Sequence, residues 1–106
     1  MSNISKKVEV KIEDGDKHVP TGNESYWFWC PGCNFAHGYN TGIGPGPHWT
    51  FNGDMEAPTF GPSLLVHGKK RCHMFLEAGK IRFLDDCQHE LAGKTVDLPP
   101  LPDWLK

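Results

Sequence analysis

Four cysteines in two separate segments have the arrangement of a metal site. The first pair is the Cys30-Pro31-Gly32-Cys33 knuckle, in which proline and glycine favour a tight turn that brings both thiols to one point. Cys72 and Cys87 lie well downstream. Four thiolates around one ion leave no coordination position for water. The sequence therefore predicts a structural zinc site formed by Cys30, Cys33, Cys72 and Cys87.

Two histidines beside the later thiols leave the ligand set open. His73 follows Cys72 and could replace it, and His89 could replace Cys87 because the two share the same parity on an extended strand. A helical turn would move His89 elsewhere. Either imidazole could instead donate a hydrogen bond that orients a ligand. Catalytic zinc is less favoured, because the chain has neither the His-x-Glu of zinc deaminases nor the His-Glu-x-x-His of zinc proteases.

A β-hairpin is predicted to position the later thiols. Residues 72–77 and 80–85 alternate in polarity around Ala78-Gly79, a pattern typical of two strands joined by a short turn. One face of this hairpin is apolar and carries Cys72, whereas His73 points to the polar face. The predicted register pairs Leu76 with Ile81, Met74 with Phe83, and Cys72 with Asp85.

The composition predicts one small β domain. The chain of 106 residues contains 12 glycines and 9 prolines, and it lacks long runs of helix formers, which indicates short strands and many turns. A core of this size is modest, so a metal cross-link would add stability. We expect a mainly β antiparallel domain, either zinc-ribbon-like or a small barrel or sandwich, over residues 1–106. It would comprise an N-terminal strand and loop at 1–24, a core at 25–98 and a proline-rich tail at 99–106.

The remaining elements are predicted from alternation and turn residues. Strands are expected at residues 8–12, 25–29, 35–39, 48–51, 63–67 and 95–98. Loops are expected at 20–23 and 40–47, a turn at 14–16, and one helical turn at 88–93 that stops at Gly93. In the tail, Trp104 and Leu105 are expected to pack back on the domain.

Charge and terminal sequence restrict the setting. The formal net charge is −2, which gives no general attraction to a phosphate backbone. No apolar run reaches the length of a membrane span, and the first residues lack the apolar core of a signal peptide. We therefore expect a cytoplasmic protein, in a reducing compartment where the cysteines are metal thiolates and not disulfides.

The order of motifs resembles an uncharacterised family of small phage and prophage proteins. The resemblance covers residues from about Tyr26 to Leu98. It is carried by residues 28–33, 49–54, 57–66, 71–75, 79–84 and 86–93. The resemblance implies a phage or prophage origin and supports a metal site, but it implies no established activity.

The leading hypothesis for function is a non-enzymatic, zinc-stabilised β domain that binds a macromolecular partner, for example a host protein. It is favoured by the closed metal site, the abundant aromatic residues and the lack of a complete catalytic set. The expected contact surface is the glycine- and proline-rich loop together with Trp49, Asn52, Asp54 and Trp104.

Two alternatives belong to other functional classes. The first is a metal-dependent hydrolase or nuclease that uses His73, His89 and Asp86 around an open metal. The second is a nucleic-acid or nucleotide binder, in which a basic cluster lies beside exposed aromatic residues. That cluster comprises Lys69, Lys70, Arg71 and Arg82.

Overall fold

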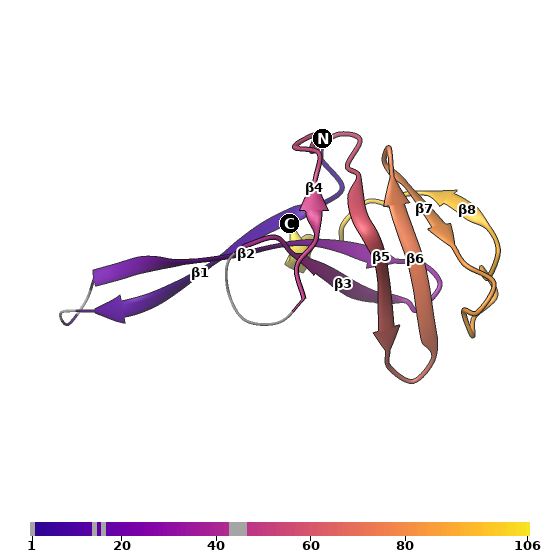
Figure 1. The fold of residues 1–106 in the computed structure, drawn as a ribbon, viewed down its shortest axis with the longest axis horizontal. Helices are drawn as coiled ribbons and strands as arrows, with labels where there is room; N and C mark the ends of the chain where they lie inside the picture. The colour runs from indigo at the N-terminus through magenta and orange to yellow at the C-terminus, as the bar shows by residue number, and fades with distance from the viewer. Residues whose placement is uncertain (1, 14, 16, 43–46) are drawn as a thin grey trace.

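The computed structural model describes residues 2–13, 15, 17–42 and 47–106, which form two antiparallel sheets (Figure 1). The first sheet has the order β1-β2-β3, with β1 at Ser5–Glu13, β2 at Lys17–Cys30 and β3 at Phe35–Asn40. The second has the order β4-β5-β6-β7-β8, with β4 at Thr50–Phe51, β5 at Phe60–His67, β6 at Arg71–Glu77, β7 at Lys80–Phe83 and β8 at Thr95–Asp97. The predicted mainly β, antiparallel fold is confirmed.

Aromatic rings from both sheets form the core between them. Tyr39 of β3 stacks on Phe60 of β5 with 4.3 Å between ring centroids, and Phe28 of β2 lies 5.7 Å from Tyr39. All three side chains are almost fully buried. Aliphatic residues of β6 and β7 complete the core from the second sheet. The rings therefore join the two sheets through stacking as well as through burial of apolar area.

Strands β1 and β2 form a ribbon that extends away from the body (Figure 1). The segment 20–23, predicted as a loop, belongs to β2. Pro20 pairs with Val10, and a register irregularity between this pair and the pair Val8–Glu24 takes up the extra residues of β2. Val8, Val10 and Ile12 are 46%, 47% and 65% exposed, although their alternation with charged residues is the pattern of a half-buried strand. Residues 14 and 16 of the predicted turn lie outside the described part, as do residues 43–46 of the predicted glycine- and proline-rich loop.

The β6–β7 hairpin has the predicted register over its strands. Met74 pairs with Phe83 and Leu76 with Ile81, around a turn in which Ala78 and Gly79 both have positive φ. Such φ values match the twist of a two-residue hairpin. Strand β7 ends at Phe83, so the predicted partner of Cys72, Asp85, lies beyond the ladder. Cys72 is fully buried and faces the core, as predicted.

The segment after β7 turns twice before β8 begins. Residues 88–93 form turns and no α-helix, and Gly93 has a φ of +75°. β8 pairs with β7 as the predicted edge strand. In the tail, the short 3₁₀ helix Asp103–Leu105 docks through buried Leu105, whereas Trp104 is 66% exposed and touches Trp29 only edge-on.

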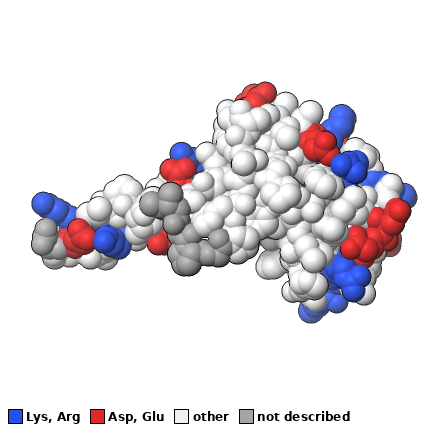
Figure 2. Space-filling model, viewed as in Figure 1, with Lys and Arg blue, Asp and Glu red and all other residues white. Residues whose placement is uncertain are grey.

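Charged groups of both signs are interspersed at the tip of the ribbon and at the end of the body that holds β5 to β8 (Figure 2). The central part of the face shown is largely uncharged. In the part of the chain that is described, no helix is long and apolar enough to cross a membrane.

Candidate functional site

Four potential metal ligands gather at one point inside the fold. The donor atoms of Cys30, Cys33, Cys72 and His89 all lie within 4.8 Å of one another. Cys30 ends β2, Cys33 lies in the turn that follows, Cys72 belongs to β6, and His89 lies in the segment between β7 and β8. Cys30 and Cys72 are fully buried, and His89 is 8% exposed. A single ion here would tie both sheets and the β7–β8 segment together.

The knuckle between the first two thiols depends on glycine. The Cys33 N–H donates to Cys30 Sγ over 3.4 Å, which closes the turn. A Cβ on Gly32 would lie 2.3 Å from His89 Cε1, too close for any side chain. Asn34, just after the knuckle, has a φ of +54°, a conformation that asparagine tolerates better than most residues. Gly32 thus allows the imidazole to pack directly on the turn.

Three contacts hold the His89 ring in place. Its Nε2 lies 3.2 Å from Cys72 Sγ, and the Leu91 N–H donates to its Nδ1 over 3.2 Å. Phe83 meets the ring edge-on at 4.8 Å between centroids. The imidazole is therefore aimed at the thiols.

The thiols favour a bound cation on electrostatic grounds. The contact with Cys72, at 3.8 Å between sulfurs, lowers the pKa of Cys30 to about 4. Burial, followed by the negative charge of Cys30, raises the pKa of Cys33 to about 11. The same contact with Cys30 raises the pKa of Cys72. One thiolate thus suppresses ionisation of the others, and a divalent cation would relieve that repulsion.

Cys87, placed in the predicted ligand set, makes different contacts. Its Sγ accepts a hydrogen bond from the His73 N–H at 3.2 Å and donates to the His73 carbonyl at 3.1 Å. The gathered set is the alternative in which His89 takes the place of Cys87. The alternation of side chains along β7 cannot be extended to Cys87, because β7 ends at Phe83 and the chain turns before Cys87.

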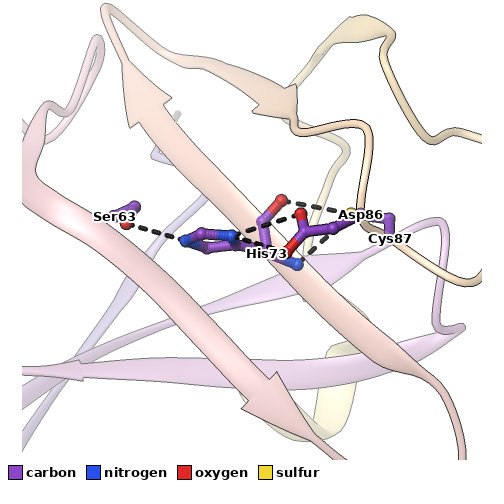
Figure 3. Close-up of polar contacts among 4 residues, drawn as sticks. All are labelled: Ser63, His73, Asp86 and Cys87. Atoms are coloured by element: carbon purple, nitrogen blue, oxygen red, sulfur yellow. Dashed lines mark hydrogen bonds and ion pairs between the residues drawn. The ribbon is translucent and has the colours of Figure 1, made fainter.

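A second polar cluster joins Ser63, His73 and Asp86 (Figure 3). Ser63 Oγ lies 2.9 Å from His73 Nε2. His73 Nδ1 lies 3.1 Å and 3.2 Å from the two carboxylate oxygens of Asp86. The side chains of His73 and Asp86 are 25% and 45% exposed, so the cluster is accessible from solvent. A hydroxyl, an imidazole and a carboxylate in this order form the arrangement that activates a serine nucleophile.

Pairing between β5 and β6 brings the serine to the histidine. His73 is opposite Leu65, so Ser63 is its diagonal neighbour on the same face. The β5–β6 register shifts between Phe60 and Leu64, and such irregularities re-aim side chains. Trp49 donates its Nε1–H to the Ser63 carbonyl over 3.1 Å and so holds the main chain of β5.

Sequence reasoning missed Ser63. It follows Gly61-Pro62 and lies in no Gly-x-Ser-x-Gly motif, and such triads are recognised by geometry and not by sequence order. His73 and Asp86 were candidates, but for a metal-dependent hydrolase. The structure places them against Ser63 and each other, and places His89 with the thiols.

The predicted partner-binding residues have local roles in the fold. Asn52 Oδ1 accepts from the N–H groups of Asp54 and Thr59, and Asp54 Oδ1 accepts from two further N–H groups of the same loop. Trp49 is half-buried, and Trp104 is exposed. Partner binding by these four residues stays a prediction.

Comparison with known protein families places the chain in a family. A family described as bacterial ubiquitination-like system serine protease (BubE) matches residues 4–84, well over half of the chain. The chain belongs to the BubE family. The matched range includes Ser63 and His73 as well as the three gathered thiols, and it ends just before Asp86. No curated protein and no solved structure matches the chain. A phage or prophage origin stays a prediction.

Proposed function

We propose that the protein is a serine protease that acts in a bacterial ubiquitination-like system. The observation that carries the proposal is the 2.9 Å contact between Ser63 Oγ and His73 Nε2, with Asp86 on the other ring nitrogen. The description of the BubE family supports the same activity. This proposal replaces the non-enzymatic binder as the leading hypothesis, because a complete nucleophile, base and orienting group are present.

In the proposed mechanism, Ser63 Oγ attacks the carbonyl carbon of the scissile bond while His73 Nε2 takes the hydroxyl proton. The Asp86 carboxylate accepts a hydrogen bond from His73 Nδ1–H, which keeps the imidazole oriented and stabilises its protonated form. His73 then gives the proton to the leaving amine as the acyl bond breaks, which leaves an ester on Ser63. A water molecule, deprotonated by His73, hydrolyses this ester and restores the free serine.

The substrate is proposed to be a protein. The family description refers to a ubiquitination-like system, so we place the scissile bond in a ubiquitin-like protein or in its conjugate. The side chains of His73 and Asp86 are partly exposed, which suits binding of an extended segment of a macromolecule. The protein partner expected from the sequence is, in this proposal, the substrate; a host protein as partner, a nucleic-acid ligand and a cytoplasmic location stay predictions.

Zinc is the metal proposed for Cys30, Cys33, Cys72 and His89. Three thiolates and one imidazole are a usual tetrahedral set for this ion, and four protein ligands make the site structural. The donor set fits because its atoms are mutually close and largely buried. The ion would stabilise the fold, and the protein's own side chains would carry out the hydrolysis.

The proposal is tested with a ubiquitin-like protein from such a system, fused to a reporter domain. The unmodified protein is expected to release the reporter, and Ser63→Ala is expected to abolish release because no nucleophile remains. Ser5→Ala, which changes a serine in β1, is the matched control and should cleave normally. Cleavage by Ser63→Ala at the normal rate would refute the assignment.

A further inference from the structure

The Cys87 thiol makes two hydrogen bonds to the main chain of His73. It accepts from the N–H at 3.2 Å and donates to the carbonyl at 3.1 Å. Cys87 is 8% exposed, so water competes little for these bonds. One buried side chain thus fixes the peptide groups on either side of the His73 Cα.

The same segment reaches the imidazole of His73. Asp86 directly precedes Cys87, and its carboxylate lies 3.1 Å from His73 Nδ1 (Figure 3). On the other side of Cys87, the Gln88 N–H donates to the Arg71 carbonyl over 2.9 Å. Residues 86–88 therefore lie along β6, and Cys87, the middle residue of the three, is bonded to the main chain of that strand at His73.

Asp86 needs such an attachment because its own side chain is poorly confined. The carboxylate is 45% exposed, and a solvated carboxylate gains little from one ion pair. Its alignment with His73 must then come from the main chain that carries it. We propose that Cys87 is a positioning residue for the triad, which holds Asp86 in register with His73 through the thiol contacts to the His73 main chain. The inference rests on the proposed function.

This role is distinct from metal binding. The donors that gather at one point are Cys30, Cys33, Cys72 and His89, whereas the Cys87 thiol is occupied by a peptide N–H and a carbonyl. Serine can replace a thiol as donor and acceptor, but it does not replace a zinc thiolate. A Cys87→Ser variant therefore separates the two roles.

The test uses Cys87→Ala and Cys87→Ser with a fluorophosphonate probe, which reacts covalently with activated serines. In Cys87→Ala, the limiting rate of Ser63 labelling is expected to fall about 10²-fold, the effect of a displacement of roughly 1 Å. The half-saturating probe concentration and the metal content should be unchanged. Cys87→Ser should recover most of the rate.

Several outcomes would overturn the proposal. Loss of metal from Cys87→Ala would make the thiol a ligand, and a normal labelling rate would show that positioning does not depend on it. Equal loss of rate in Cys87→Ser and Cys87→Ala, or loss of the cooperative thermal transition in both, would assign Cys87 to folding alone. If instead Ser63→Ala labels as fast as the unmodified protein, the proposed function itself fails.

Discussion

At the scale of single residues, the proposed hydrolysis depends on two contacts of the His73 imidazole. His73 meets Ser63 through Nε2 and Asp86 through Nδ1. The first contact allows transfer of the hydroxyl proton, and the second fixes which nitrogen faces the serine. In the proposed protease, full activity therefore requires Asp86 in addition to the two residues that exchange the proton.

Asp86→Asn tests this requirement. The amide can donate to Nδ1, which favours the wrong tautomer, so the rate of Ser63 labelling is expected to fall about 10⁴-fold. Asp85→Asn removes the neighbouring exposed carboxylate and should label at nearly the normal rate. A small effect of Asp86→Asn, or an equal effect of both changes, would contradict the assigned role of Asp86.

At the scale of secondary structure, strand β6 contributes to both sites, the metal cluster on one face and the triad on the other. Adjacent residues of a strand point to opposite faces, so Cys72 joins the buried thiols while His73 joins the accessible triad. The segment after β7 repeats this division, since it supplies Asp86 to the triad and His89 to the metal cluster. A metal ion on one side of the sheet would thus hold together the elements that carry the proposed catalytic groups on the other.

Gly32→Ala tests whether the packing of His89 on the turn at Gly32 holds its imidazole next to the thiols. The added methyl would lie 2.3 Å from the buried imidazole, so the ring must move away from the thiols. Metal affinity, measured by competition with a chromophoric chelator, is expected to fall about 10- to 100-fold, and the thermal midpoint should fall with it. Gly68→Ala is the control, because its methyl would have nothing nearer than 4.0 Å. Unchanged affinity in Gly32→Ala would argue against ligation by His89.

The sequence sufficed for local geometry and failed where distant segments meet. Alternation and the Ala78-Gly79 turn predicted the register of β6 and β7, and hence the opposite directions of Cys72 and His73. His89 in place of Cys87 was one of the alternatives that the sequence left open, and strand parity could not decide between the two because β7 ends at Phe83. Ser63 escaped notice because its partners approach only when β5 pairs with β6 and the β7–β8 segment folds back.

The whole molecule is elongated, with principal extents of 50 × 28 × 24 Å, because the β1–β2 ribbon leaves the body (Figure 1). Replacement of residues 11–19 by Asn-Gly would keep the pairing of Val10 with Pro20 and remove the outer ribbon. An isolated two-stranded ribbon adds little stability, so the unfolding free energy is expected to change by less than about 1 kcal/mol. Fluorophosphonate labelling should stay normal. A large loss of either, seen by thermal unfolding or labelling, would mean that the ribbon supports the body.

Mass spectrometry of the intact protein after exposure to the fluorophosphonate probe shows whether Ser63 is an activated nucleophile. One adduct per chain is expected, located on Ser63 by peptide mapping and absent from Ser63→Ala. No adduct on a folded protein that has its metal, or an adduct that persists in Ser63→Ala, would contradict the proposed role of Ser63.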